Sequence, residues 1–250
     1  MKKPSLSKHV LRFDELDSTN THAKQILKDQ DVPEGTIIQC HHQTAGRGYA
    51  SNTWESSPGK NITASWVLRP HFLRPDEQFM LTQAFSLAIK ETILSYYSGN
   101  VSIKWPNDIY ADDQKLAGIL VENSIMGDTI KDCIAGIGLN VNQDVFNSDA
   151  PNPVSLKQLC HKDFNLDEVL QKLHENLEKH YFSLDTAQRE ETQRKYHKSL
   201  YRLEQRSRFR AEGREFEGTI KGTDMYGRLQ MQLDDGTLAL FDFKEVEFLI

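Results

Sequence analysis

Residues 104–123 carry charged side chains in a segment whose pattern otherwise predicts buried strands. The sequence is KWPNDIYADDQKLAGILVEN, and we expect a β-hairpin with its turn at residues 112–114. Lys104, Asp108 and Lys115 lie in its apolar arms. Burying an unpaired ammonium or carboxylate costs several kcal/mol, so such groups usually have partners. The fold must therefore supply a partner for these charges, and that partner could be a ligand.

The two lysines of this hairpin point to an anion. If the turn closes as expected, Lys104 and Lys115 lie on adjacent strands at one end of a sheet. Two ammonium groups would repel there unless a phosphate or carboxylate lay between them. Asp108 could instead pair with either lysine, which is the purely structural alternative. Asn107 and Asn140 add neutral groups suited to ribose or phosphate, so the set suggests a site for a nucleotide and an anionic small molecule.

Three glycines fall inside apolar strand patterns, at Gly118, Gly136 and Gly138. Glycine weakens a strand unless something must approach the backbone closely. A bulge or tight packing would explain one such glycine. Three of them beside charged residues favour a surface on which a flat ligand lies.

The segment QTAGRGYASNTW, residues 43–54, predicts a polar loop that binds an anion. Gly46 and Gly48 would let backbone N–H groups converge, and Arg47 adds a cation with fork geometry. The indole of Trp54 could stack on a heterocycle. The loop lacks both the P-loop and the dinucleotide-binding patterns, and a surface loop without a role is the alternative. We expect residues 45–52 to be mobile without ligand and to order over it.

The order of patterns predicts an α+β domain followed by a small β barrel. Helical patterns follow the capping residues 17–20, run between Pro75 and Gly99, and recur around 170–181, among strands that favour one mixed, mainly antiparallel sheet. From about residue 207 short alternating strands take over. We expect two domains, residues 1–206 and 207–250.

The composition is that of an ordinary globular protein, with 38% hydrophobic and 26% charged residues. Apolar runs fall short of the roughly 20 residues of a membrane span, and the N-terminus lacks a signal-peptide core, so we expect a cytoplasmic protein that binds no membrane. A net charge of −6 predicts no nucleic-acid binding. Three widely spaced cysteines and no HExxH pattern predict neither disulfides nor a structural metal.

Six blocks, in this order and spacing, resemble biotin protein ligase. They are DSTN (17–20), QTAGRG (43–48), WESSPGKN (54–61), KWPND (104–108), KLAGIL (115–120) and GIGLNV (136–141). The resemblance spans residues 10–185. It implies the biotin-lipoate ligase fold, which is class II synthetase-like, with a C-terminal SH3-like barrel.

The resemblance implies a two-step reaction with ATP, Mg²⁺ and biotin. The biotin carboxylate would attack the α-phosphate to give biotinyl-5′-AMP, and a lysine of a biotin carboxyl carrier domain would then take the biotinyl group. By position, the biotin-binding residues would be Ser18, Thr19, Asn20, Gln43, Gly46, Arg47, Gly48, Lys115 and Gly118.

The resemblance also implies roles for the charged residues. Lys115 would bridge the biotin carboxylate and the α-phosphate, and Arg47 would add a second cation where negative charge develops. Lys104 and Asn107 would hold phosphates and metal-linked water. Asp108 would orient or deprotonate the acceptor lysine. In the ATP site, Trp54 would stack near adenine and Asn140 would touch the nucleotide or its metal.

Two departures and three alternatives accompany the resemblance. Tyr49 stands where family members often have a second loop arginine, and it could shield the adenylate by stacking. Only about 16 residues precede DSTN, too few for the helix-turn-helix domain of bifunctional members, so we expect a ligase alone. The alternatives are lipoate or octanoate transfer, a noncatalytic biotin sensor and a repressor. Apolar strand edges would also permit a homodimer.

Overall fold

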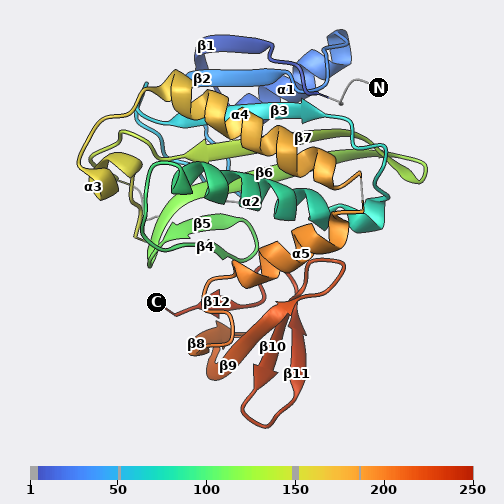
Figure 1. The fold of residues 1–250 in the computed structure, drawn as a ribbon, viewed down its shortest axis with the longest axis vertical. Coiled ribbons are helices and arrows are strands. Elements are labelled where there is room, and N and C mark those ends of the chain that lie inside the picture. Colours follow the sequence, from blue (N-terminus) through green and yellow to red (C-terminus); the bar gives the residue numbers. More distant parts are fainter. Residues whose placement is uncertain (1–4, 50–51, 148–151, 186, 250) are drawn as a thin grey trace.

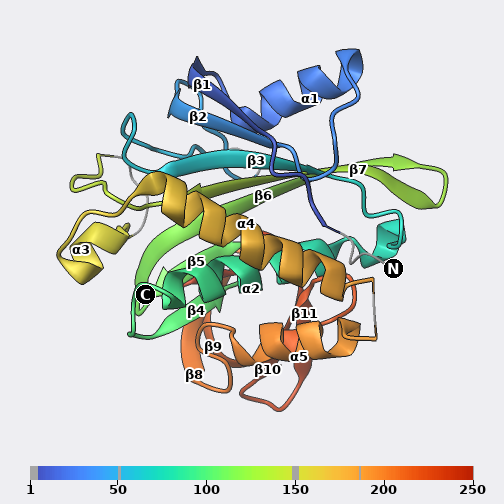
Figure 2. The ribbon, with the colours of Figure 1, turned by 45° about the horizontal axis from the view of Figure 1, so that its top comes forward.

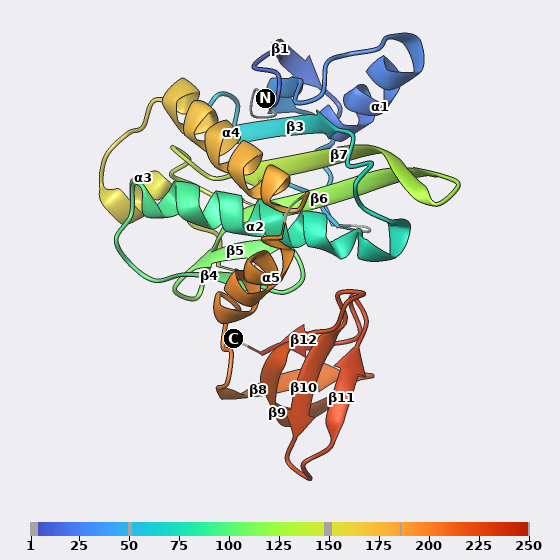
Figure 3. The ribbon, with the colours of Figure 1, turned by 45° about the vertical axis from the view of Figure 1, so that its right-hand side comes forward.

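The chain forms two separate β-sheets, a large one that carries most of the helices and a small one at the C-terminal end (Figure 1). The computed structural model describes residues 5–49, 52–147, 152–185 and 187–249. Figures 2 and 3 show the small sheet below the large one, and in Figures 1 and 3 helix α5 (Arg189–Lys198) lies between them.

The large sheet has seven strands and is mainly antiparallel. Only the pair β1 and β2 is parallel. In spatial order the strands are β1 (Val10–Leu16), β2 (Ile37–Gln43), β3 (Ile62–Leu68), β7 (Thr129–Leu139), β6 (Gln114–Met126), β5 (Asp108–Ala111) and β4 (Val101–Lys104). The expected α+β class is confirmed.

One face of the large sheet carries the main hydrophobic core. Strand residues alternate between faces, so Trp66 of β3 and its even-numbered neighbours point to this side. Trp66 and Phe85 are fully buried there. Phe85 belongs to helix α2 (Phe79–Leu94), which crosses this face together with α4 (Leu166–Ser183) (Figure 1). This packing makes the sheet a rigid support.

The opposite face is covered by helix α1 (Thr19–Asp29) only over part of its width. Ala23 of α1 packs there against Ile38, Val67 and Ile134, in a second and smaller core. Further along the same face the strand positions are glycines. The part of the sheet covered by α1 therefore ends where the pocket described below begins.

The remaining elements complete the two layers. Short helices lie at η1 (Pro75–Glu77) and α3 (Leu156–Cys160), the second capped by the Ser155 side chain. Tyr196 lies in α5, whereas Leu200 and Leu203 lie beyond it in isolated bridges to Ile103 and Ile220. Among the described ranges, no helix is long and apolar enough to cross a membrane.

The small sheet has five antiparallel strands, as expected of a C-terminal barrel. They are ordered β11 (Leu238–Phe241), β10 (Leu229–Leu233), β9 (Arg214–Thr223), β8 (Arg206–Ala211) and β12 (Glu247–Phe248). A loop of this sheet contacts the larger part of the chain, because Trp105 Nε1 donates a hydrogen bond of 2.8 Å to the carbonyl oxygen of Gly227. The two sheets are thus joined by direct contacts as well as by the chain.

Candidate active site

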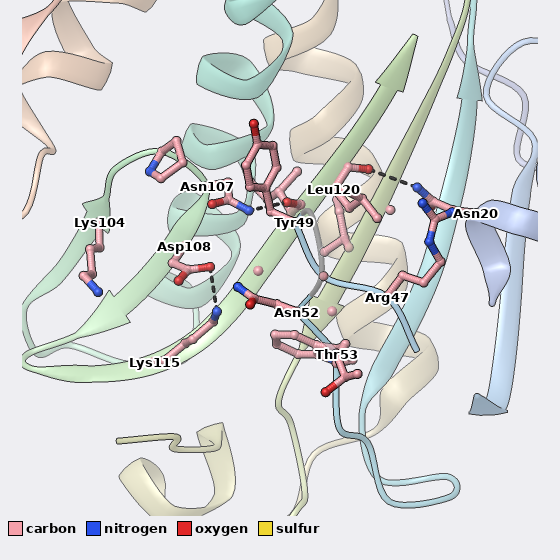
Figure 4. Close-up of a pocket in the computed structure, with 18 of the residues that line it drawn as sticks. Asn20, Arg47, Tyr49, Asn52, Thr53, Lys104, Asn107, Asp108, Lys115 and Leu120 are labelled. Atoms are coloured by element: carbon pink, nitrogen blue, oxygen red, sulfur yellow. Dashed lines mark hydrogen bonds and ion pairs between the residues drawn. The ribbon is translucent and has the colours of Figure 1, made fainter. Parts of the chain in front are cut away.

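A cavity of about 360 Å³ opens on the α1 face of the large sheet, over β6 and β7. Twelve of the fourteen predicted site residues line it, and Figure 4 labels those that carry most of the charge, among them Arg47, Asp108 and Lys115. The twelve are Ser18, Thr19, Asn20, Gln43, Arg47, Gly48, Trp54, Lys104, Asn107, Asp108, Lys115 and Gly118. The cavity has a polar end beside α1, where Thr19 and Asn20 lie, and a charged end beside β4 and β5, where Lys104 and Asp108 lie.

The polar end is built on the first turn of α1. Gln43 Oε1 accepts hydrogen bonds from the Thr19 backbone N–H at 2.8 Å and from the Thr19 hydroxyl at 3.1 Å, so it caps the helix. Ser65 Oγ, from β3, lies 2.7 Å from Thr19 Oγ1 and 2.6 Å from Asn20 Oδ1. Its single proton can serve only one of these acceptors at a time. The other acceptor is available to a ligand N–H.

The strand glycines make room for protein side chains in this structure. A Cβ atom at Gly136 would lie 2.2 Å from Asn20 Oδ1, and one at Gly138 would lie 2.2 Å from Trp54 Cε2. Gly118 is paired with Gly138 across β6 and β7, and the Trp54 indole lies over both. The predicted flat surface exists, and the flat group that covers it here is Trp54. Its Nε1 is buried without a partner among the described residues.

The charged end contains an ion pair between Lys115 and Asp108. Lys115 Nζ lies 2.8 Å from Asp108 Oδ1, and both side chains are about one-fifth exposed. The expectation that Lys104 and Lys115 lie on adjacent strands is wrong. Lys104 ends β4 and Lys115 lies in β6, with β5 between them, because the chain turns a first time at residues 105–107. Asp108 therefore partners Lys115, as the structural alternative allowed.

Lys104 is held by aromatic groups. Its Nζ lies 5.1 Å from the ring centroids of both Tyr110 and Phe248 and donates a hydrogen bond of 3.3 Å to the Tyr110 hydroxyl. Burial lowers the pKa of Lys104, the attraction of Asp108 opposes this, and the nearby charges of Lys115 and Arg202 lower it further. A buried cation with a lowered pKa is a good partner for an anionic ligand, since the ligand restores the lost stabilisation.

The loop between β2 and β3 closes on itself beside the pocket. Gly48 N donates to Asn52 O at 2.8 Å and Trp54 N donates to Gly46 O at 2.9 Å, and Arg47 and Thr53 form an isolated bridge. These contacts fix the ends of the loop and place Trp54 over Gly118 and Gly138. Residues 50 and 51, part of the predicted mobile segment 45–52, lie outside the described residues.

Arg47 points to the polar end of the cavity, away from Lys115 and Asp108 (Figure 4). Its Nη2 lies 3.1 Å from Oε1 of Glu122. Sequence reasoning placed Arg47 with Lys115 and missed Glu122, although Glu122 belongs to the charged hairpin segment. The available signal was a carboxylate among apolar residues on the same strand face as Gly118.

Two predicted residues do not line the cavity. Gly46 lies at the base of the loop, and Asn140 is buried beyond β7, where its Nδ2 donates to the Val154 carbonyl at 3.1 Å. Asn107 lines the cavity, and its Nδ2 also donates to Ile119 O at 2.7 Å, which fastens the 105–107 turn to β6. The structure adds pocket residues from outside the predicted set. They include Tyr49, Asn52, Thr53 and, from the C-terminal part, Lys244, Val246, Glu247 and Phe248.

A model of the biotin/lipoate A/B protein ligase family matches residues 12–140, just over half of the chain. The chain belongs to this family. The matched range contains most of β1, all of β2 to β7 and every predicted site residue.

Individual relatives agree with this membership. The bifunctional ligase/repressor BirA of Bacillus subtilis is 37% identical over 144 residues, which are 57% of this chain and 43% of that protein. The biotin–[acetyl-CoA-carboxylase] ligase of Mycobacterium tuberculosis is 31% identical over 129 residues, which are 50% and 46% of the two chains. The chain spans about half the length of these curated relatives.

Solved structures extend the likeness to both sheets. The biotin protein ligase from Aquifex aeolicus in complex with biotin and ATP superimposes with a TM-score of 0.80 at 25% identity, over 96% of this chain and 98% of that one. A biotin protein ligase from Leishmania major in complex with biotinyl-5-AMP gives a TM-score of 0.66 at 20% identity. At 20% identity, the likeness to the Leishmania major structure shows a shared fold alone.

Proposed function

We propose that this protein is an ATP-dependent ligase that activates biotin as biotinyl-5′-AMP and transfers it to a lysine of a biotin carboxyl carrier domain. The observation that carries the proposal is that one cavity has both a polar end at Thr19, Asn20 and Gln43 and a cationic end at Lys104 and Lys115. Family membership supports it, as do the names of the relatives. Biotin has a ureido ring at one end and a carboxylate at the other, which matches this polarity.

In the first step a biotin carboxylate oxygen attacks the α-phosphorus of ATP, and the bond from that phosphorus to the bridging oxygen breaks to release pyrophosphate. Negative charge accumulates on the phosphorus oxygens, and preorganised cations stabilise it. Lys115 and Lys104 are the two lysines of the charged end of the cavity, and both line it. The face of Trp54, 5.7 Å from Lys115 Nζ to its ring centroid, is placed to stack on the adenine.

In the second step the amine of the acceptor lysine attacks the carbonyl carbon of the anhydride, and the bond to the phosphate oxygen breaks to release AMP. The attacking amine must lose a proton, because an ordinary lysine with a pKa of about 10.4 is mostly protonated at neutral pH. Asp108 is the carboxylate nearest to Lys115 in the cavity and is our candidate to receive that proton. Lys115 keeps Asp108 oriented through the ion pair.

Magnesium would enter this site with ATP. Mg²⁺ usually keeps several waters and binds one or two carboxylates together with substrate phosphates. The donor set fits this habit, since the carboxylates Asp108 and Glu247 both line the cavity. The ion would neutralise phosphate charge.

The polar end favours biotin over lipoate or octanoate. A ureido group has two N–H donors and a carbonyl acceptor, and Asn20, Thr19 and Ser65 offer one acceptor that the protein leaves unserved. A dithiolane or alkyl end would bury these polar groups unpaired. Sites built to hydrogen-bond a substrate reject analogues that lack the matching groups.

The experiment is labelling of a purified carrier domain by this protein with ATP and biotin, followed by intact mass, with lipoate and octanoate in parallel. We expect one biotinyl group on the carrier lysine and no transfer of the other acids. Tight biotin binding without transfer would contradict the ligase and support a sensor.

The variant Lys115→Gln isolates the chemistry. It should abolish pyrophosphate release while the melting temperature stays within a few degrees of the wild type, because Lys115 is partly exposed and its packing is kept by Gln. The matched control is Lys131→Gln, which should remain active. Lys131 is an exposed lysine of β7, at the end of that strand away from the cavity. Near-normal pyrophosphate release by Lys115→Gln would exclude the assigned role.

Other conclusions from the sequence stay predictions. These are the cytoplasmic location, a homodimer, the absence of nucleic-acid and membrane binding, and the division of the chain at residue 206.

A further inference from the structure

Glu122 lies at the junction of the polar end and the loop, and the proposed function gives it no role. It is on β6, on the same strand face as Gly118, with its side chain 18% exposed. Its Oε1 lies 2.6 Å from Lys24 Nζ and 3.1 Å from Arg47 Nη2. Its Oε2 accepts from Asn20 Nδ2 at 2.9 Å. One carboxylate thus joins three segments of the chain.

Two of these partners come from one face of α1. Asn20 and Lys24 are four residues apart on the helix, so both side chains can reach the same strand. Arg47 comes from the loop after β2. Figure 4 shows its guanidinium beside Asn20 and far from Lys115. In this structure, therefore, Arg47 is paired with Glu122 at the polar end of the cavity.

The charges make Glu122 an anion with two cations. Burial alone would raise the pKa of Glu122, but hydrogen bonds from Lys24 and Asn20 and the charges of Lys24 and Arg47 outweigh burial and lower it. A half-buried carboxylate that lost its only cation would pay a large penalty. Glu122 would not, because Lys24 remains when Arg47 leaves. Because Lys24 keeps Glu122 paired, Arg47 can leave Glu122 at a small cost in free energy.

We propose that Glu122 is a positioning residue that holds Arg47 at the polar end in the ligand-free protein, and that Lys24 keeps Glu122 paired when Arg47 moves to an anionic ligand. The proposal rests on the proposed function only for the identity of that ligand, the phosphates of ATP or the adenylate. The hold of Glu122 on Arg47 itself does not depend on it.

The test uses ATP as the probe and measures its dissociation constant by calorimetry. Lys24→Met leaves Arg47 as the only cation on Glu122, so Arg47 is held more tightly and ATP binding should weaken about two- to fivefold, the range of partly exposed ion pairs. Glu122→Gln keeps an acceptor for Asn20 and frees Arg47, so ATP binding should be equal or tighter. Lys24→Arg keeps the cation and is the matched control.

Double variants distinguish two explanations of the Lys24→Met effect. One is the movement of Arg47 from Glu122 to ATP, and the other is a direct electrostatic effect of the Lys24 charge on ATP. If the first explanation is correct, Lys24→Met with Glu122→Gln should bind ATP like Glu122→Gln alone. In an Arg47→Met background, Lys24→Met should have no further effect. If removal of the Lys24 charge acted through space on ATP, its effect would persist in both backgrounds, and that result would overturn the proposal.

A ligand-free measurement keeps the inference independent of ligase activity. Amide hydrogen exchange at residues 44–48 should be faster in Glu122→Gln than in wild type, with melting temperatures compared to exclude general loosening. Unchanged exchange would refute the hold on Arg47. Failure of the wild type to bind ATP would overturn the proposed function while leaving this exchange measurement to decide the role of Glu122.

Discussion

Lys104 is a partly buried cation without a close carboxylate among the residues that the structure describes. Its ammonium lies between the rings of Tyr110 and Phe248, and its hydrogen-bond partner there is the Tyr110 hydroxyl. Burial raises the pKa of Tyr110, so this hydroxyl stays neutral and cannot offset the charge. A phosphate would supply the missing counter-charge.

The lowered pKa of Lys104 predicts a pH dependence of nucleotide binding. A lysine with a folded-state pKa below the ordinary value of about 10.4 loses its proton earlier as the pH rises. The cation is therefore lost at a lower pH than that of an exposed lysine. We expect the KM for ATP to increase as the pH rises toward about 10, on the order of tenfold once the charged hydrogen bond is fully lost. Steady-state pyrophosphate release measured across this range would check it.

Two variants identify the titrating group. Lys104→Arg stays protonated throughout, so its KM for ATP should stay flat up to pH 10. Lys104→Met should have a raised KM at every pH and an equal or higher melting temperature, because the buried charge is gone. An alkaline rise in KM that persists in both variants would assign the titration to another residue.

At the scale of elements, the facing glycines of β6 and β7 determine where the Trp54 indole can lie. Gly118 and Gly138 are directly opposed, and the indole covers them from the loop side. Two neighbouring strands without side chains on one face form a flat strip, which a ring system can approach closely. The loop thus packs on the sheet through Trp54, Gly118 and Gly138.

Gly138→Ala should dislodge the indole. The new Cβ would lie 2.2 Å from Trp54 Cε2, far inside contact distance, so the ring must move. Overpacking of this kind costs about 1–3 kcal/mol. We expect the free energy of unfolding to fall by about 1 kcal/mol, near the low end because the loop can shift, and ATP binding to weaken. Urea unfolding and calorimetry measure the two effects.

Gly118→Ala provides a graded comparison, since its Cβ would lie 3.0 Å from Trp54 Cζ3 and should cost less. Adding Trp54→Leu to Gly138→Ala should restore the unfolding free energy but not ATP binding. Equal losses with and without the indole would show that the strand itself, and not Trp54, suffers from the added methyl group.

Local signals predicted most elements of the fold and much of the site. Strand glycines and the polar loop are departures from a regular pattern, and the pocket contains both. Contacts across long sequence separations were out of reach: Glu122 pairs with Lys24 and Arg47, which are 98 and 75 residues away. The four-residue strand β5 was also too short to separate from its turns, so Lys104 was placed next to the wrong strand.

At the scale of the whole molecule, the C-terminal part completes the site. Val246, Glu247 and Phe248 line the cavity. Phe243 contacts aromatic rings of the larger part of the chain. The Phe243 ring centroid is 5.3 Å from that of Trp105 and 5.6 Å from that of Tyr49, which it meets edge to face. Tyr49 also lines the cavity, where the resemblance places a second loop arginine in other members.

This contact predicts that the small sheet helps retain the activated intermediate. Without Phe243, the Tyr49 ring loses its aromatic partner and the loop loses a contact worth about 0.5–1.5 kcal/mol. Phe243→Ala should therefore release biotinyl-5′-AMP roughly two- to tenfold faster from the protein, as should Tyr49→Ala. A chase of labelled intermediate with excess unlabelled biotin measures the release rate.

The double variant and a surface control test the coupling. Tyr49→Ala with Phe243→Ala should release the intermediate no faster than the more severe single variant, because both remove one contact. Leu240→Ala, an exposed position on β11, should leave the rate unchanged. Additive rates in the double variant would mean that Phe243 acts on the cavity through Trp105 instead, and the small sheet would then support the KWPND turn and not the loop.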